Sequence, residues 1–481
     1  MNNVGASALS FAAMLLAGCT VGPPYQRPAV DIPATYLRAP VEPSAPSIAD
    51  VAWWKVFGDP RLEALIREAL RDNVDLAVTA QQILQAEAQV AAARSPIFPH
   101  LTGQSQVSRD NNNVAFATAN SFAAALALSW EIDLWGRYRS ATEAARANLL
   151  ATEEGRSGVI TSLVAGVAQQ YLQLNGLRQR LDVVNRTAAA QRDSLRLVTL
   201  LAKQGVQSAA EVRQAETQVL TTENQIPALE LQIAQVEDAL AILLGKPPRT
   251  FDIGPELTPH ALPPQVPPGV PSELLERRPD IRQAEQQLVA ANANVGVARA
   301  QFFPSISLTG SLGRASDTLR GLVASRGETT HAIAAAVGAP IFQGGALVAN
   351  YASARAQAEQ AALQYRRTVL VALQEVSDAL AAYDRDGAEA QGNRNRVAVS
   401  TEYLRLANLR FRSGVISYLE VLDAQRQLLS AQLDLNASEV NQRLATVQLY
   451  KALGGGWNAA EPVATRAPMH DDREHRQGDG R

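Results

Sequence analysis

The sequence repeats itself, and this internal repetition constrains the fold more than any other feature of the chain. Two pairs of segments match at nearly the same spacing, with offsets of 205 and 209 residues. The matched residues are Asp75 with Asp280 and Phe98 with Phe303 at the first offset, and Gly205 with Gly414 and Glu211 with Glu420 at the second. The chain therefore reads as two copies of one unit of about 200 residues, which predicts two similar halves in one protomer.

Each copy is expected to contain a helix, a β-hairpin, a very long helix, a tight turn and a further helix. The Pro-rich stretch 262–271 is expected to be a stiff linker between the copies. The first copy, 59–261, is expected to hold a hairpin at about 100–133, a long helix over 137–203 and a helix over 206–245. The second copy, 272–457, is expected to hold a helix over 279–301, a hairpin at about 304–343, a long helix over 346–412 and a helix over 415–453.

The expected helices carry apolar residues at alternating steps of three and four, the spacing of a coiled-coil heptad. These seams run from Ile160 to Ala188, from Ile226 to Leu243 and from Val369 to Tyr383. We expect the helices to pack against each other along their length. The helix over 137–203 would be roughly 100 Å long, and Pro227 is expected to kink the helix over 206–245.

The only cysteine of the chain, Cys19, directly follows an uncharged apolar stretch. Residues 1–18 have the anatomy of a secretory signal peptide and are too short for a spanning helix. Leu16 to Cys19 resembles the lipobox of bacterial lipoproteins, in which the cysteine is acylated and becomes the mature N-terminus. This predicts diacylglycerol and N-palmitoyl groups on Cys19, followed by an extended segment over 19–58. Thr20 rather than Asp follows the cysteine, which favours the outer membrane; a buried core cysteine is the alternative.

In both expected hairpins the pattern changes to a period of two, which is typical of strands. One face carries apolar residues: Phe122, Leu126, Leu128, Trp130 and Ile132 in the first hairpin, and Ile306, Leu308, Leu312, Ile333, Val337 and Ile341 in the second. The other face carries mostly Ser, Thr, Gln and Ala. Transmembrane barrels show this pattern in segments of about ten residues, although an ordinary half-buried hairpin is the commoner source of alternation. Four such strands behind a lipoprotein signal favour the membrane.

Four strands per chain cannot close a membrane barrel, because the smallest such barrels have about eight strands. An open sheet edge in lipid would leave its backbone groups without hydrogen-bond partners. The barrel must therefore be shared between chains, with eight strands from a dimer or twelve from a trimer. The small and polar inward face favours the larger, open lumen, and hence a channel.

The composition excludes several classes of function. A formal net charge of −3 offers no basic surface for nucleic acid. Beyond the signal there is no run of apolar residues long enough for a spanning helix. We find no Gly-rich phosphate loop, nucleophile elbow or His/Cys metal spacing, so we expect no enzyme activity, no cofactor and no metal site. The charged tail 458–481 is expected to be disordered.

Three stretches carry a resemblance to a known family: CTVGPPYQRP from Cys19, LLERRPDIRQAEQQLVAANANVGVARAQFFPSISLTGS from Leu274, and SYLEVLDAQRQLLSAQ from Ser417. They resemble the outer membrane factors of tripartite efflux and export systems, of the TolC, OprM and NodT type, over roughly 19–457. The resemblance implies a mainly α fold with membrane β: a homotrimer with a twelve-stranded outer-membrane β-barrel, continued by a long α-helical coiled-coil barrel in the periplasm. It also implies a periplasmic adaptor, an inner-membrane pump of the RND type and outer-membrane lipid as partners, in a Gram-negative bacterium.

The same resemblance implies that the adaptor docks on the two tight turns at the ends of the long helices. The residues concerned are Gly205, Val206, Gly414 and Val415. Turn chemistry by itself also accounts for the two glycines, because a helix end often needs a left-handed residue.

The periplasmic gate is expected just inside the second turn, where the family has rings of acidic residues that narrow the closed entrance. Glu420 follows Ser417 by three residues, so a capping box also accounts for it. Asp423 has Gln214 as its counterpart in the first copy, so the repeated geometry does not demand a carboxylate there. Asp423 is therefore the better gate candidate, and Phe411 is expected to add packing that holds the turns shut.

The leading interpretation is an exit duct that passively conducts small toxic compounds or drugs from an inner-membrane pump to the outside. One alternative is the outer-membrane channel of a type I, ABC-driven protein or peptide export system, which the fold does not separate from the first. A second alternative is a structural coiled-coil lipoprotein without a pore, which would form no heat-stable oligomer.

Overall fold

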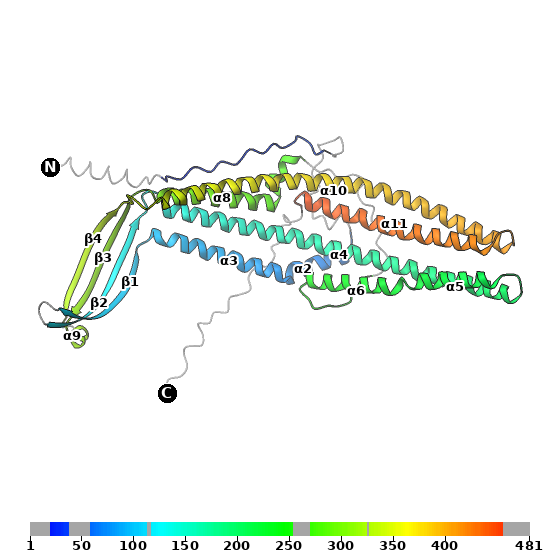
Figure 1. Ribbon diagram of the computed structural model, residues 1–481, viewed down its shortest axis with the longest axis horizontal. Coiled ribbons are helices and arrows are strands. Elements are labelled where there is room, and N and C mark those ends of the chain that lie inside the picture. The colour runs from blue at the N-terminus through cyan, green and yellow to red at the C-terminus, as the bar shows by residue number, and fades with distance from the viewer. Residues whose placement is uncertain (1–19, 38–57, 113–116, 254–269, 325–326, 456–481) are drawn as a thin grey trace, which may run out of the picture. The chain divides into compact units, whose positions relative to one another are not determined.

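The computed structural model describes residues 20–37, 58–112, 117–253, 270–324 and 327–455 (Figure 1). The chain divides into two compact units. The first unit comprises the described parts of Met1–Asp31, Val78–Arg156 and Pro279–Val371, and the second those of Ile32–Ala77, Ser157–Arg278 and Ala372–Arg481. Two helices of 67 residues, α4 (Arg137–Lys203) and α10 (Ala346–Arg412), begin in the first unit and end in the second.

The first unit contains a four-stranded antiparallel sheet in the order β1, β2, β3, β4. The strands are β1 (His100–Asn112), β2 (Ala117–Ile132), β3 (Ser305–Ser316) and β4 (Glu328–Gly338). β1 pairs with β2 and β3 with β4 as hairpins, and the short helix α9 (Leu319–Val323) lies between β3 and β4. β2 and β3 join the hairpins into one sheet, so β1 and β4 are its two edges.

The register of the sheet gathers the apolar side chains on one face. Leu101 lies opposite Leu128, Leu308 lies opposite Trp130, and Val337 lies opposite Ile306. Because side chains alternate between the two faces of a strand, the intervening Ser, Thr, Gln and Ala residues share the other face. Every residue of β4 is exposed.

The second hairpin ends earlier than the sequence pattern suggested. We expected Ile341 to continue the strand, but β4 ends at Gly338. The reason is that Ser305, the first residue of β3, already pairs with Gly338. No strand of the described chain lies beside the residues that follow, and Ile341 is 91% exposed.

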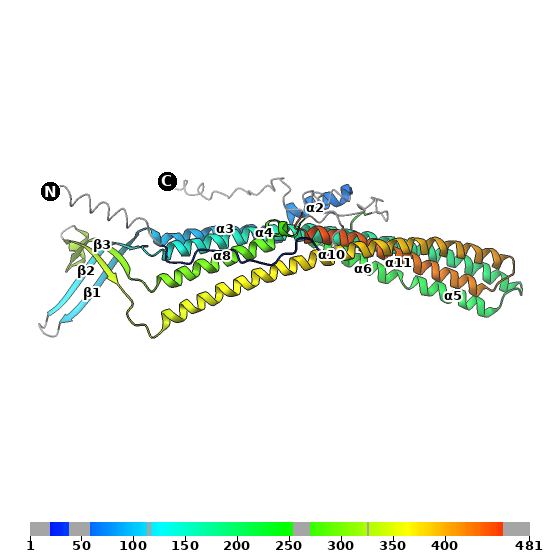
Figure 2. The same ribbon diagram turned by 90° about the horizontal axis from the view of Figure 1, so that it is seen from above.

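Helices α3 (Val74–Arg94) and α8 (Pro279–Ala300) precede the two hairpins and lie beside the first part of α4 (Figure 2). The Thr142 hydroxyl on α4 donates to the carbonyl of Ala93 on α3, at 3.4 Å. A Cβ placed on Gly296 of α8 would come within 2.9 Å of the Ser140 hydroxyl on α4. Small residues therefore allow α8 and α4 to approach closely.

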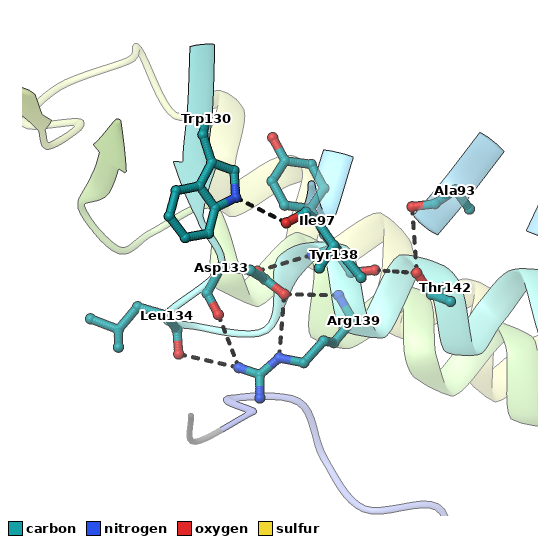
Figure 3. Close-up of polar contacts among 8 residues, drawn as sticks. All are labelled: Ala93, Ile97, Trp130, Asp133, Leu134, Tyr138, Arg139 and Thr142. Atoms are coloured by element: carbon teal, nitrogen blue, oxygen red, sulfur yellow. Dashed lines mark hydrogen bonds and ion pairs between the residues drawn. The ribbon is translucent and has the colours of Figure 1, made fainter. Parts of the chain in front are cut away.

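Asp133 fixes the passage from β2 into α4 (Figure 3). Its carboxylate accepts hydrogen bonds from the backbone N–H groups of Tyr138 and Arg139, at 3.1 and 2.9 Å, and so occupies donors that the first helical turn leaves free. The Arg139 guanidinium returns to the Asp133 carboxylate and carbonyl. Close by, the Trp130 indole N–H donates to the carbonyl of Ile97. These contacts therefore fix the direction of α4 relative to β2.

The first described residues, 20–27, lie along α8 in the first unit and are called the strap below. The Arg27 guanidinium makes two hydrogen bonds of 2.6 Å to the Glu285 carboxylate, and the Tyr25 hydroxyl donates to the same group. Glu285 is only 8% exposed. Gly22 lies directly against Gly296, since a Cβ on Gly22 would meet the Gly296 Cα at 3.0 Å.

The second unit has a helical core. It contains α2 (Pro60–Asp72), α5 (Ala209–Glu223), α6 (Ile226–Leu243), α7 (Leu274–Arg277), α11 (Tyr418–Ala452) and the distal parts of α4 and α10. Leu62 of α2, Leu174 of α4, Leu240 of α6 and Tyr450 of α11 are fully buried in one cluster. Asp59 caps α2 and also accepts a short hydrogen bond from Tyr171.

The helix expected over 206–245 is interrupted. It forms two helices, α5 and α6, with Asn224 and Gln225 between them. Pro227 occupies the first turn of α6, where its missing N–H costs nothing. Inside a continuous helix the same residue would lack a hydrogen bond to the carbonyl four residues earlier, so the expected kink takes the form of a break.

No helix within the described residues is both long and apolar enough to cross a membrane.

Candidate functional site

Two glycine turns in the second unit form the candidate site. α4 ends at Lys203, and the N–H groups of Gly205 and Val206 bond back to the carbonyls of Ala202 and Leu201. In the second turn the N–H groups of Gly414 and Val415 bond to the carbonyls of Phe411 and Arg410. Both are Schellman motifs, which is why Gly205 and Gly414 have φ angles of 78° and 74°. A side chain at either glycine would be strained although the space around it is open.

The two valines that follow the glycines are presented to solvent. Val206 is 64% exposed and Val415 is 65% exposed. The turns therefore place two pairs of small and apolar residues on the surface, in matching local geometry. This is where the structure puts the four residues expected to dock an adaptor.

The helices after the turns begin differently, although a serine precedes a glutamate by three residues at the start of both. Before α5, the Ser208 hydroxyl accepts from the backbone N–H of Glu211, and the Glu211 carboxylate accepts from the N–H of Ser208. Before α11, the Ser417 side chain makes no capping hydrogen bond. Glu420 bonds to the Ser417 carbonyl only through its backbone, and its side chain is exposed. The expected capping role of Glu420 is therefore wrong.

Asp423 is half-exposed and bonded within its own helix. Its carboxylate accepts a 2.6 Å hydrogen bond from the Gln427 amide and lies 3.4 Å from the Arg426 guanidinium. Both partners are on α11, one turn further along. Glu420 and Asp423 are both available on the surface near the second turn, and neither has a contact that requires it for the fold of this turn.

Phe411 occupies a different place from the two acidic residues. It is 7% exposed and its ring lies 5.4 Å from that of Tyr418. The two rings belong to a buried cluster that joins α4, α5, α10 and α11 next to the two glycine turns. The cluster includes Val198 of α4 and Ala215 of α5. Phe411 therefore packs the turns together inside one protomer.

Three residues that the sequence analysis missed connect α4 to α11 in this region. The Gln425 amide donates to the Ser194 hydroxyl at 3.2 Å, and Ser194 also bonds to the Tyr418 hydroxyl. Burial raises the pKa of the Tyr418 hydroxyl above its ordinary value. Gln425 and Ser194 lie on helix faces without distinctive neighbours in the sequence, and only the tertiary contact identifies them.

Cys19, the expected lipidation site, lies outside the described residues. The next residue, Thr20, packs against Gly136 at the junction of β2 and α4. A Cβ on Gly136 would come within 2.8 Å of the Thr20 side chain, and its φ of +76° also favours glycine.

Comparison with known proteins decides the family. The model of the family described as outer membrane efflux protein matches residues 65–246 and 270–455. The chain belongs to the outer membrane efflux protein family. It is therefore an outer-membrane protein of an efflux system, mainly helical in fold, and the family is not one of enzymes.

Individual outer membrane efflux proteins match over nearly their whole length. The toluene efflux pump outer membrane protein TtgC of Pseudomonas putida is 37% identical over 462 residues, which cover 93% of this chain and 95% of that protein. The cation efflux system protein CusC of Escherichia coli is 34% identical over 455 residues, 92% of this chain and 97% of that protein. The solved structure of the outer-membrane channel OprN superposes with a TM-score of 0.83 and 30% identity, covering 91% of this chain and 100% of that one.

Proposed function

We propose that three copies of this chain form the outer-membrane duct of a tripartite efflux pump. Each copy contributes its four strands to a twelve-stranded barrel, and the long helices of the three copies continue the barrel through the periplasm. The observation that carries the proposal is the sheet: one face is apolar and the other is small and polar, and within the described residues no further strand pairs with its edges, β1 and β4. Open edges are not tolerated in lipid, so copies must pair to close the sheet.

The partners in this proposal are a periplasmic adaptor and an inner-membrane pump of the RND type. The adaptor docks on the exposed turns at Gly205, Val206, Gly414 and Val415, which offer apolar contacts and freely accessible backbone. Diacylglycerol and palmitoyl chains on Cys19 anchor the N-terminus in outer-membrane lipid, since two or more chains hold a protein stably.

The cargo in this proposal is small toxic compounds. One relative is named for toluene efflux and another for cation efflux. In this proposal the duct therefore does not restrict the transported compounds to one chemical class. The small polar face of the sheet supports this breadth, because Ser, Thr, Gln and Ala offer few strong binding groups. Selection then belongs to the pump that loads the duct.

The periplasmic gate in this proposal is made by Asp423 together with Glu420. Three copies of each carboxylate around a threefold axis form rings that narrow the entrance and attract cations. Their mutual repulsion resists full closure unless the carboxylates are bridged or partly protonated. The absence of any capping bond at Ser417 supports a role for Glu420 outside local helix stability. Phe411 acts indirectly, by holding the turns of each protomer in place.

The test is single-channel conductance of the purified full chain in planar bilayers. Asp423→Ala and Glu420→Ala should raise the conductance and reduce the preference for cations. Asp434→Ala is the matched control, because this residue lies on the same helix and pairs with Arg396. A folded oligomer that forms no pore would overturn the duct. A pore that is indifferent to both variants would keep the duct and remove the gate from these residues.

A further inference from the structure

The apolar face of the sheet carries basic side chains at one end. This is the end at which the two hairpins turn, opposite to the end where the strands meet the long helices, and we call it the hairpin end. Directly opposed residues of paired strands share a face, and side chains alternate along each strand. The register therefore places Arg109 of β1 and Arg314 of β3 on the same face as Leu101 and Leu312. His331 of β4 lies opposite Leu312 and belongs to this face too.

The carboxylates described on the strands lie on the other face. Glu328, the first residue of β4, pairs with Ala315, and Glu131 of β2 pairs with Ser307. Both partners are odd-numbered residues of β3, whereas Arg314 is even-numbered, so they point to the opposite side of the sheet. Among the strand side chains that the structure describes, charge is therefore sorted: arginines on the apolar face, carboxylates on the small and polar face.

The spacing along the strand puts Arg314 at the edge of the apolar surface. It follows Ile306 by eight positions, which is about 26 Å along the strand and about 20 Å along the axis of a barrel with tilted strands. The apolar band of a membrane barrel is about 25 Å tall. A long Arg side chain near this edge extends outward and keeps its guanidinium among the lipid headgroups.

The arginines retain free hydrogen-bond donors. Within the described residues, no hydrogen bond or ion pair occupies the guanidinium of Arg109 or Arg314. Arg109 lies opposite Asn120, and Arg314 lies opposite Thr329, so each arginine has a neutral neighbour whose side chain can also donate. Two donor groups result: Arg109 with Asn120, and Arg314 with Thr329 and His331. Strand spacing and rise place their two arginines roughly 16 Å apart.

We propose that these two donor groups bind the phosphates of an anionic lipid in the outer leaflet of the outer membrane. This placement rests on the proposed function, in which the hairpin end lies at the outer surface because the long helices leave from the other end. Each group binds one phosphate, so the matching lipid carries two phosphates on one headgroup, as lipid A does. Its acyl chains lie along the exposed side chains of Leu126, Leu312 and Ile333.

Phosphate suits these donors better than other lipid groups do. A guanidinium binds phosphate through two parallel hydrogen bonds, which a compact ammonium group cannot form in the same way. A charged side chain on a lipid-facing surface is costly unless it has a partner of opposite charge. The lipid phosphate supplies that partner, and the carboxylates of Glu131 and Glu328 lie on the other face and do not compete for the arginines.

Binding of fluorescent diphosphoryl lipid A to the purified full-length oligomer in neutral detergent, followed by anisotropy, tests the proposal. Arg109→Gln and Arg314→Gln should each weaken binding about fivefold, and the double variant about 25-fold, as expected for basic residues at an anionic lipid surface. Arg314→Lys should lose less than Arg314→Gln because the charge remains. Arg355→Gln on α10 is the matched control, since it removes the same charge from an exposed residue outside the sheet and should leave binding unchanged.

Monophosphoryl lipid A provides the second comparison. The native oligomer should bind it more weakly than diphosphoryl lipid A, and the double variant should lose this preference. Equal binding of the two lipids by the native oligomer, or an equal loss in Arg355→Gln, would overturn the phosphate site. If one arginine variant fails to assemble, the other carries the test.

Pore formation by the same preparations in phosphatidylcholine bilayers examines the proposed function separately. A native oligomer that forms pores but binds no lipid A would overturn the lipid site and leave the duct intact. A native protein that forms no pore would instead overturn the duct.

Discussion

Glu211 and Glu420 occupy the same position in the repeat, but their side chains make different hydrogen bonds. Their serine neighbours are identical, so the sequence predicts two capping boxes, and only the first one forms. The side-chain geometry at a helix start depends on tertiary contacts that spacing does not encode. Asp423 and Phe411 were predictable as candidates near the turn. The Ser194–Gln425 link was not, because it requires α4 and α11 to be in contact.

The pair of glutamates gives the first prediction. Glu211→Ala should lower the stability of the first turn by about 1 kcal/mol, because it removes the carboxylate half of a capping box. Glu420→Ala should change stability by less than about 0.5 kcal/mol, as expected of an exposed residue without such a role. Hydrogen exchange of the amides at the start of α5 and α11 measures both. Equal losses of protection at the two helices would contradict this assignment.

Phe411 gives the second prediction. Phe411→Ala should destabilise the tip cluster by about 3–5 kcal/mol, since it leaves a cavity beside Tyr418. Phe411→Leu should cost less because most of the volume is retained. Thermal unfolding together with protease cleavage at the turns provides the measurement. The matched control is Leu409→Ala, an exposed apolar residue on the same helix, and a similar cost for both variants would argue against a buried role.

Among the elements, the helices were the most predictable from the sequence. The expected ranges 137–203 and 346–412 coincide with α4 and α10, because a heptad seam sustained over many turns is typical of a long helix packed along its length. The β-pattern predicted the strands and their faces, but not the end of β4 at Gly338. The residue at which a strand ends depends on the strand that pairs with it, and the alternating pattern along one strand does not identify that partner.

The break between α5 and α6 gives the third prediction. Pro227→Ala restores an N–H in the first turn of α6, which allows the helix to run continuously through Asn224 and Gln225. Both residues already have helical backbone angles, so little rearrangement is needed. Exchange at the amides of residues 225, 226 and 228 should slow several-fold, with Pro248→Ala as a control outside the helices. Unchanged exchange would mean that packing, rather than proline, holds the break open.

At the scale of the whole molecule, the strap joins parts of the chain that lie far apart in sequence. The Arg27–Glu285 pair spans 258 residues, and Ala80 stands in place of Glu285 in the first copy of the repeat. This is why the contact could not be anticipated from the sequence. The strap also places Thr20 at the junction of β2 and α4.

The strap gives the fourth prediction. Glu285→Ala should leave the Arg27 and Tyr25 donors without this acceptor, and the N-terminal segment should become sensitive to protease with a loss of about 1–3 kcal/mol. Gly296→Val should have a similar effect by steric means, since its Cβ would strike Gly22 and Ser140. Glu359→Ala on α10 is the control. Resistance of the segment to cleavage in both variants would show that other contacts hold it.

Because α4 and α10 have the same length, the two glycine turns at their ends lie at the same distance from the two helix starts, measured along each helix. Deleting one heptad from α4 alone would shift Gly205 relative to Gly414 by about 10 Å. The buried cluster of Val198, Ala215, Phe411 and Tyr418 would then be pulled out of alignment. A change in the length of the long helices, whether by evolution or by design, therefore has to be made in both α4 and α10, at corresponding positions of the two copies.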